Sequence, residues 1–351
     1  MNHRKLQAFF ASRAGRGEPL ALATVFETKG STYSKAGARM LIDGNGIFQG
    51  MLSGGCLEGD LAIRAQVVLE SGQAQFASYD LSSNDDELWG LGVGCDGLMR
   101  IFMQAITARQ DYEPFQSISR LELGRERARA ITVIESKYEG APAGATLLLV
   151  DGHVQNFGFD DAARDAVTHA AQEAVACSPG VTNMLVGESA LTLLDTPIQP
   201  VPRLLVLGAG LDAEPVVRLA AEVGWLCTVA DHRPAYIDNN DFETAERSLC
   251  VNAAEIGNAI RLNEFDLAVV MSHHLASDRS YLAQLAHSTI GYIGLLGPPG
   301  RRNRLLSELG DAANALRPRL RGPAGLDLGG RGPAAIALSI VAEMQQHLAA
   351  T

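Results

Sequence analysis

The sequence has no apolar stretch long enough to cross a membrane, and residues 1–10 lack the apolar core of a signal peptide. Its five cysteines are widely spaced and form neither a CxxC pair nor a zinc-finger pattern. These absences argue against a membrane protein, a secreted disulfide scaffold and a zinc module. We therefore expect a cytoplasmic protein with reduced thiols.

A net positive charge is also missing. The 351 residues carry a formal net charge of −11, with a sequence pI of about 5.2. Such a chain has no long-range attraction for nucleic acid or for an anionic membrane, so we expect neither as a partner. Repeats and low-complexity tracts are absent as well. With 47% hydrophobic residues, the chain is long enough for two globular domains.

Three prolines fall close together in residues 196–202, which makes this run the best candidate for a domain boundary. We expect an α+β domain over residues 1–195, a linker over residues 196–202 and a second domain over residues 203–351. Expected strands of the first domain lie at residues 20–27, 39–42, 47–51, 76–80, 98–106, 130–135, 146–150 and 191–194. Its expected helices lie at residues 1–15, 57–70 and 160–174.

Strand and helix patterns alternate in the second domain, which predicts a Rossmann-like, doubly wound parallel sheet. Expected strands lie at residues 203–207, 226–230, 266–271 and 290–295. Expected helices lie at residues 213–223, 278–286, 302–309 and 334–348. The predicted class is therefore α/β, with an N-terminal α+β domain followed by a Rossmann-like domain.

A glycine-rich turn follows the first strand of that second domain. Gly208 and Gly210 come directly after the strand, Ala213 takes the third position of the G-x-G-x-x-G/A pattern, and Asp231 ends the next strand. Gly210 would let a phosphate approach the start of a helix, and Asp231 would accept hydrogen bonds from a ribose diol. Asp212 would repel a pyrophosphate, unless it caps the helix. The turn therefore either binds a nucleotide or is a scaffold for another ligand.

Two histidines follow a later strand of the same sheet. His273 and His274 could bind a metal, move protons or contact a phosphate, or they could be solvated loop residues.

Arginines open a helix near the end of the expected sheet. Positive charges oppose the macrodipole at a helix N-terminus, so Arg301 and Arg302 are candidates for binding an anion. Pairing with Glu308 or Asp311 would resolve the same conflict without a ligand.

Two cysteines of the first domain lie in glycine-rich loops. Cys56 follows Ser53-Gly54-Gly55 at the predicted start of a helix, a position that favours thiolate, although acidic residues in the first turn oppose it. Cys95 follows Gly94 just before a strand. We predict that both thiols reach one ligand or metal, with Ser53, Gly54, Gly55 and Gly94 beside it. The alternative is that each is a buried small hydrophobic residue.

A polar loop over residues 29–39 separates the first two strands. Its residues Ser31 and Lys35, together with Ser34 and Arg39, could hold a phosphate or pterin edges, or could be a solvated hairpin loop. The acidic run at residues 85–87 is more typical of a solvated loop than of a metal site.

Several long motifs, taken in order, resemble the XdhC/CoxI family over nearly the whole chain. They are KGSTYSKAGARM, SGGCLEGD, WGLGVGCDG, VLGAGLDAEPVVRLA, SHHLASDRSYL, YIGLLGPPGRRNR and GLDLGGRGPAAIALSIVAE. One departure is visible, because Pro298-Pro299-Gly300 replaces the serine–arginine stretch usual in the family after YIGLLG.

The resemblance implies an accessory factor rather than an enzyme. Such a factor binds molybdenum cofactor (molybdopterin) as cargo and assists its sulfuration and insertion into a xanthine-dehydrogenase-type enzyme. Cys56 and Cys95 match the cofactor-handling cysteines of the family and are the implied metal ligands. The implied partners are the client enzyme and, as a second candidate, a cysteine desulfurase. We also expect a homodimer, and a nucleotide could still occupy the Rossmann site.

Two other hypotheses remain open. An NAD(P)-dependent oxidoreductase would use the Rossmann domain for hydride transfer, although no Tyr-x-x-x-Lys pair or other hydride-transfer motif is found. A sulfur carrier or redox sensor would use Cys56 and Cys95 as a disulfide or a persulfide.

Overall fold

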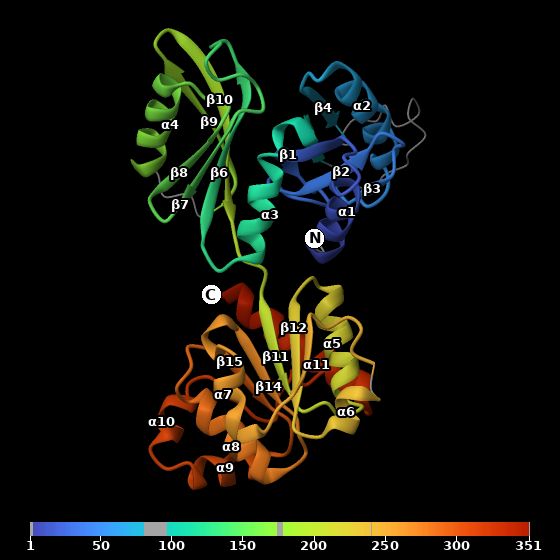
Figure 1. The fold of residues 1–351 in the computed structure, drawn as a ribbon, viewed down its shortest axis with the longest axis vertical. Coiled ribbons are helices and arrows are strands. Elements are labelled where there is room, and N and C mark those ends of the chain that lie inside the picture. The colour runs from blue at the N-terminus through green and yellow to red at the C-terminus, as the bar shows by residue number, and fades with distance from the viewer. Residues whose placement is uncertain (1–2, 81–96, 174–177, 240, 351) are drawn as a thin grey trace. The chain divides into compact units, whose positions relative to one another are not determined.

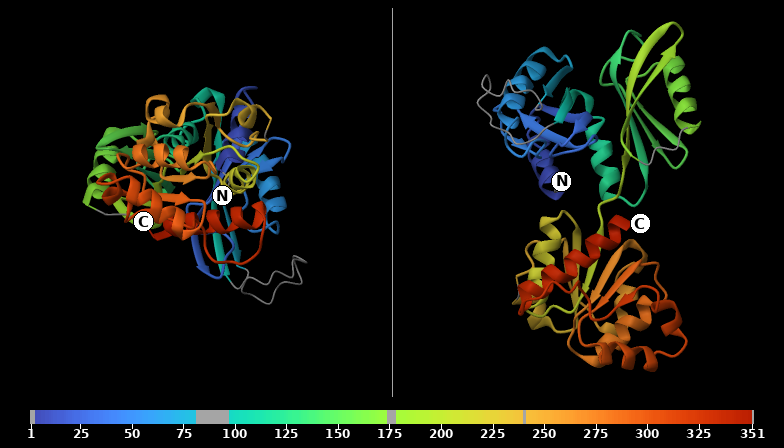
Figure 2. Two further views of the ribbon diagram at one scale, coloured as in Figure 1. Left: turned by 90° about the horizontal axis from the view of Figure 1, so that it is seen from below. Right: turned by 180° about the vertical axis from the view of Figure 1, so that it is seen from behind.

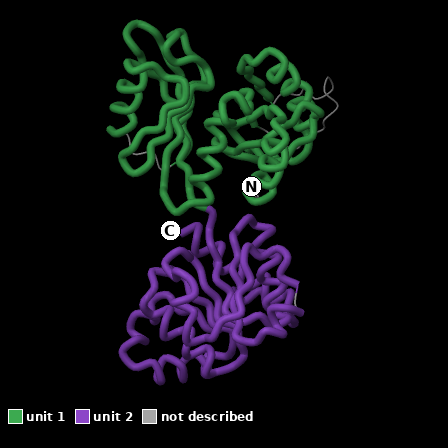
Figure 3. Tube along the Cα trace, in the orientation of Figure 1, with its two compact units in different colours: residues 1, 3–200 green, residues 2, 201–351 purple. Residues whose placement is uncertain are grey.

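The computed structural model describes residues 3–80, 97–173, 178–239 and 241–350. The chain divides into two compact units, His3–Pro200 and Val201–Thr351 (Figure 3). Each unit has its own sheets and its own hydrophobic cores. Within the described ranges, no helix combines the length and the apolar character that a membrane span requires.

The first sheet of unit 1 is antiparallel, in the order β3-β2-β1-β5-β4 (Figure 1). Its strands are β1 (Leu20–Gly30), β2 (Arg39–Asp43), β3 (Phe48–Gln49), β4 (Gln75–Asp80) and β5 (Gly97–Ile106). Side chains alternate along β1, so that Ala21 and Val25 join the core under α2 (Glu58–Ser71). Leu20 and Leu22 join the core under α1 (His3–Ala14) on the opposite face. Helices therefore cover both faces.

The second sheet of unit 1 is also antiparallel, in the order β8-β7-β6-β10-β9. Its strands are β6 (Ala128–Ser136), β7 (Thr146–Val150), β8 (His153–Phe157), β9 (Gly180–Val186) and β10 (Ser189–Ile198). The helix α4 (Asp161–Glu173) packs on one face, and α3 (Phe115–Leu123) packs on the other. A small apolar cluster joins this sheet to the first one through Phe26, Phe102, Ile134 and Leu194. A short 3-10 turn, Ala108–Gln110, precedes α3.

Residues 196–198, expected in the linker, belong to β10 instead. Thr196 pairs with Ala130 and Pro197 with Arg129 on β6. The pairing of β10 with β9 ends at Asp195, so at Pro197 the strand has a neighbour on one side only. Proline lacks an N–H, and sheets accept it where one side of the strand is unpaired. The division between the two units falls after residue 200.

Unit 2 contains one six-stranded parallel sheet, in the order β13-β12-β11-β14-β15-β16. Its strands are β11 (Arg203–Leu207), β12 (Leu226–Asp231), β13 (Arg247–Cys250), β14 (Leu267–Val270), β15 (Tyr292–Leu295) and β16 (Leu320–Arg321). The order reverses between β11 and β14, as it does in Rossmann folds. The predicted fold class, antiparallel α+β followed by a Rossmann-like sheet, is confirmed.

Helices cover both faces of the parallel sheet. One face packs against α5 (Ala213–Glu222) and α11 (Pro333–Ala350), and Figure 2 shows α11 lying across it. The other face packs against α7 (Ile256–Ala259), α8 (Leu275–Leu285), α9 (Pro299–Glu308) and α10 (Ala312–Leu316). The short α6 (Pro234–Asp238) follows β12, and 3-10 turns occur at Ala253–Glu255 and Leu262–Glu264. Ligand-binding loops are therefore expected at the carboxyl edge of the sheet, between these two layers of helices.

Candidate functional sites

One buried carboxylate organises the loop that carries Cys56. Glu58 is the first residue of α2 and is only 2% exposed. It accepts hydrogen bonds from the backbone amides of Leu52, Ser53 and Gly55 at 2.9, 2.9 and 3.0 Å, and from the Ser53 hydroxyl at 2.5 Å. Four donors thus converge on one side chain. The loop is folded back onto the start of its own helix, which fixes the position of Cys56.

Ser53 and Gly55 were predicted to contact a ligand. In the structure the Ser53 hydroxyl and the Gly55 amide form hydrogen bonds within the protein instead. The Ser53 hydroxyl donates to Glu58 and accepts from the Leu57 amide at 2.8 Å. The Gly55 amide donates to Glu58. The Cys56 side chain, in contrast, is half-buried and its thiol is free. Of the residues in this loop, Cys56 is therefore the one that offers a reactive group.

The Glu58 carboxyl stays ionised in this environment. Burial alone would raise the pKa of Glu58, but hydrogen bonds from the Ser53 hydroxyl and the Ser53 and Leu52 amides outweigh burial and hold the pKa below its ordinary value. The start of α2 therefore carries a negative charge near Cys56 at neutral pH.

The polar loop predicted over residues 29–39 lies against the Cys56 loop. The Ser34 hydroxyl donates to the Met51 carbonyl at 3.1 Å. The ring of Tyr33 packs on Gly54, where an added Cβ would lie 3.2 Å from the ring. Gly54 has a φ of 80° and Gly55 a φ of 110°, which glycine adopts without strain. The structure therefore brings together two loops that are separate in the sequence.

Ser31 and Lys35 are both exposed on this polar loop. Gly97 approaches the Ser31 carbonyl so closely that an added Cβ would lie 2.5 Å from its oxygen.

Two predicted site residues, Gly94 and Cys95, lie outside the described residues. The predicted pairing of Cys56 with Cys95 on one ligand therefore remains a prediction.

Arg39, considered for phosphate binding, has an internal partner instead. It is 8% exposed, and one of its guanidinium nitrogens lies 2.5 Å from Glu122 of α3. His3 of α1 contacts the second oxygen of Glu122 at 3.2 Å. The burial of Glu122 would raise its pKa, but Arg39 and His3 hold the pKa below its ordinary value. Arg39 therefore ties the first sheet to α3 rather than facing a ligand.

The second candidate site lies at the carboxyl edge of the parallel sheet in unit 2. Gly208 follows β11 with a φ of 119°, and an added Cβ would lie 2.5 Å from the Met271 carbonyl oxygen. Glycine is therefore required where these two loops meet. Gly210 is less constrained, because its added Cβ would chiefly meet the end of the Asp212 side chain at 2.7 Å. Both predicted glycines lie directly before α5.

Asp231 has a different environment from the one that its motif predicts. Its side chain is 0% exposed, and one oxygen accepts from the Ala209 amide at 2.8 Å. The guanidinium of Arg233 binds both oxygens, Nε at 2.9 Å and a terminal nitrogen at 2.7 Å. Burial would raise the pKa of Asp231, but these hydrogen bonds hold it below the ordinary value. Asp231 thus anchors the glycine turn from beneath and does not face a ribose.

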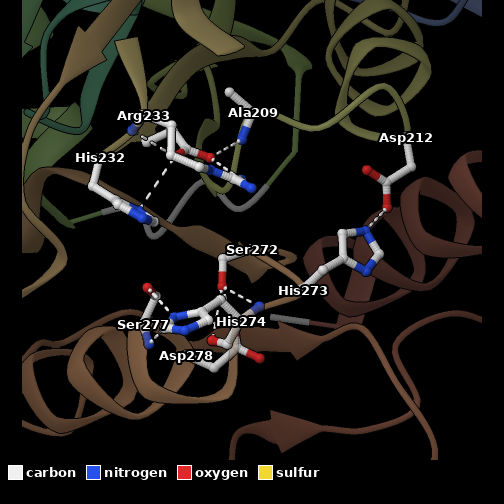
Figure 4. Close-up of polar contacts among 10 residues, drawn as sticks. Ala209, Asp212, His232, Arg233, Ser272, His273, His274, Ser277 and Asp278 are labelled. Carbon is white, nitrogen blue, oxygen red and sulfur yellow. Dashed lines mark hydrogen bonds and ion pairs between the residues drawn. The ribbon is translucent and has the colours of Figure 1, made fainter. Parts of the chain in front are cut away.

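His273 contacts Asp212 at the start of α5. Its Nε2 lies 2.6 Å from an Asp212 carboxylate oxygen, so the pair links the loops after β11 and β14 (Figure 4). His273 has a φ of 58°, a conformation that side chains other than glycine rarely adopt. Asp212 occupies the N-cap position of α5 without making a side-chain capping bond. Asp212 therefore neither caps the helix with its side chain nor stands unpaired.

His274 has a capping role. As the N-cap residue of α8, it accepts from the Ser277 amide through its ring. The preceding Ser272 hydroxyl lies 2.5 Å from Asp278 and 3.1 Å from the His274 carbonyl. Asp278, only 1% exposed, also accepts from Arg301 at 2.6 and 2.9 Å. Arg301 thereby holds the histidine loop in place and does not pair with Glu308 or Asp311.

Arg302 is half-buried beside Gly322, whose added Cβ would lie 3.0 Å from the arginine side chain. Its Nε finds no hydrogen-bond partner in the described part of the chain. Arg301 and Arg302 therefore differ, because only Arg301 has a carboxylate partner there.

Metal-ligating side chains do not cluster among the described residues, since no group of three or more His, Cys, Asp or Glu could hold an ion there. Glu58 and Arg233, which organise the two sites, were not among the predicted site residues, and the acids of the first turn after Cys56 were expected only to oppose the thiolate. A signal was available for each. Glu58 is the first-turn acid after a serine–glycine loop, and Arg233 stands two residues after the motif acid.

Comparisons with known proteins place the two units in one family. The family model described as "XdhC and CoxI family" matches residues 14–80, and the model described as "XdhC Rossmann domain" matches residues 204–344. A protein of Bacillus subtilis, described as a probable xanthine dehydrogenase subunit, is 32% identical over 94% of this chain and 93% of its own. A crystal structure described as a xanthine dehydrogenase from Bacillus halodurans is 27% identical, with a TM-score of 0.79, over 98% of this chain and 95% of that one.

Proposed function

Because the chain belongs to the XdhC and CoxI family, we propose that it is an accessory factor for a xanthine-dehydrogenase-type molybdenum hydroxylase. It binds molybdenum cofactor as cargo and assists its sulfuration and insertion into that client enzyme. The names of both relatives refer to xanthine dehydrogenase, which supports the choice of client. In this function the chain carries the cofactor and has no turnover of its own.

The observation that carries the proposal is the free, half-buried thiol of Cys56 on a loop fixed by Glu58. A soft thiolate is a suitable ligand for molybdenum. The space beside Gly55 is open as far as the described residues show, because none of them apart from its two chain neighbours has an atom within 4 Å of an added Cβ. The exposed Lys35 on the neighbouring loop supplies a positive charge for an anionic edge of the cargo. The two loops of unit 1 thus offer a metal ligand, open space and a cation.

Replacing Cys56 with alanine is expected to reduce retention of molybdenum cofactor by about tenfold or more. Even groups that only orient a metal ligand commonly contribute that much to affinity. The measurement is size-exclusion chromatography of the protein mixed with the cofactor, with molybdenum and oxidised pterin quantified in the protein peak. Wild-type protein is expected to retain close to one equivalent.

Cys250→Ala is the matched control, because Cys250 is also a free thiol but lies exposed on β13 of the other unit. It should leave retention unchanged. Equal retention by wild type and Cys56→Ala, at unchanged melting temperature, would remove this thiol from the site. No retention by the wild type would refute cofactor binding itself.

A further inference from the structure

The carboxylate at the end of β12 has no capacity left for a ribose. A carboxylate offers about four acceptor positions. Those of Asp231 receive the amides of Ala209 and Arg233 and two N–H groups of the Arg233 guanidinium, at 2.7–3.0 Å. A ribose diol would have to displace one of these bonds from a side chain with no exposed surface. The charged group that remains accessible at this strand end is Arg233.

The guanidinium of Arg233 is held by Asp231 and Tyr236, and one of its edges has no hydrogen-bond acceptor among the described residues. The guanidinium stacks on the ring of Tyr236, 3.7 Å from the ring centre, and the side chain is 30% exposed. A guanidinium has five N–H donors, of which two bind Asp231. The other three find no acceptor among the described residues. A fixed guanidinium edge of this kind matches the oxygens of a phosphate.

Two imidazoles lie near each other across the glycine turn, and one of them adds a donor. His232 follows β12 and His274 follows β14, with ring centres 6.3 Å apart (Figure 4). The His274 Nδ1 accepts from the Ser277 amide, so the neutral ring carries its proton on Nε2. This Nε2–H finds no acceptor in the described part of unit 2. His232 turns its Nδ1 toward the Asp231 carboxylate at 3.3 Å, so its Nε2 does not count among the donors.

From these donors we infer that unit 2 binds a phosphomonoester dianion through Arg233 and His274. A terminal phosphate fits better than a bridging diphosphate, because the Asp212 carboxylate stands at the start of α5, where a diphosphate would lie. Two sources carry this group: the phosphate of molybdopterin and the 2′-phosphate of a dinucleotide. The molybdopterin source rests on the proposed function and the dinucleotide source does not, and the site lies in a different unit from Cys56.

Binding of NADP⁺, NAD⁺ and molybdenum cofactor to the full chain and its variants tests the inference. The Asp231→Asn/Arg233→Gln double variant removes the ion pair without leaving a buried charge. His274→Asn removes the Nε2–H and keeps a good N-cap residue. The control is Arg247→Gln, which removes an exposed arginine from β13 elsewhere in unit 2. The double variant itself leaves the net charge unchanged, so a weaker affinity cannot be a loss of overall positive charge. Circular dichroism melting verifies that each variant is folded.

We expect at least one phosphomonoester ligand to bind the double variant tenfold or more weakly, and His274→Asn several-fold more weakly, with Arg247→Gln unchanged. Tighter binding of NADP⁺ than of NAD⁺ would identify the dinucleotide as the source. Loss confined to molybdenum cofactor would identify the pterin phosphate. If neither NADP⁺ nor the cofactor binds folded variants more weakly than wild type, the site is refuted. Cys56→Ala separates the two proposals, because it should leave NADP⁺ binding unchanged.

Discussion

Asp231→Ala lowers the free energy of unfolding of unit 2 by about 3 kcal/mol, as expected when one partner of a buried ion pair is removed. The substitution leaves the Arg233 guanidinium without its carboxylate and the Ala209 amide without its acceptor. We place the effect at the lower end of the range for buried pairs because Arg233 is partly exposed. Urea unfolding monitored by far-ultraviolet circular dichroism measures it.

The control is Asp238→Ala, which removes an exposed carboxylate at the end of α6 and should change stability by less than about 0.5 kcal/mol. The double variant Asp231→Asn/Arg233→Gln should recover much of the loss, because no uncompensated charge remains. A loss for Asp231→Ala no larger than that of the control would show that the pair does not hold the glycine turn.

Glu58→Ala is expected to lower the free energy of unfolding of unit 1 by about 3 kcal/mol, because buried donors lose their acceptor. Three backbone amides and one hydroxyl depend on this carboxylate. The same substitution should reduce retention of molybdenum cofactor although Cys56 is intact, since the loop that positions the thiol loses its anchor. Glu58→Gln keeps part of the acceptor capacity and should show smaller effects on both.

The Glu58 contribution also has a pH dependence of known sign. The pKa of Glu58 is lower in the folded than in the unfolded chain. The ionised carboxyl therefore stabilises the fold fully at pH values above 4.5, the ordinary pKa of a glutamate. This stabilisation is lost as the pH falls below 4.5 and through the lowered folded-state pKa. Urea unfolding between pH 7 and pH 3.5 should therefore show a smaller loss of stability for Glu58→Gln than for wild type. Parallel losses in both proteins would contradict this assignment.

The sequence predicts most of the fold because its main elements have strong periodic patterns. The strand expected at residues 203–207 and the helix expected at residues 213–223 appear as β11 and α5 with little change. Several elements without such patterns were missed, and so was α3, although its buried residues Phe115, Ile118 and Leu121 have helical spacing. β13 and β16 are short strands at the two edges of the sheet, and the side chains of β8 are half-buried or exposed, so none gives a clear hydrophobic alternation.

The candidate sites are harder to predict, because a motif names residues but not their partners. The G-x-G-x-x-A turn lies where the pattern places it, yet Asp231 is fully engaged by Arg233 and the backbone. Arg301 is similar, since its partner Asp278 becomes a neighbour only when α8 and α9 pack together. In this chain the arginine two residues after Asp231 indicates that the aspartate of the motif has a partner within the protein.

The three cysteines among the described residues differ in burial, which gives this part of the chain a graded set of labelling positions. Cys250 is exposed on an edge strand, Cys56 is half-buried and Cys227 is fully enclosed in the core of unit 2. A brief pulse of a maleimide at low dose would therefore favour Cys250, which makes that residue a natural attachment point for a fluorophore. Modification of Cys227 requires opening of the Rossmann core, so its alkylation by a larger dose, detected by mass spectrometry, reports the opening of that core.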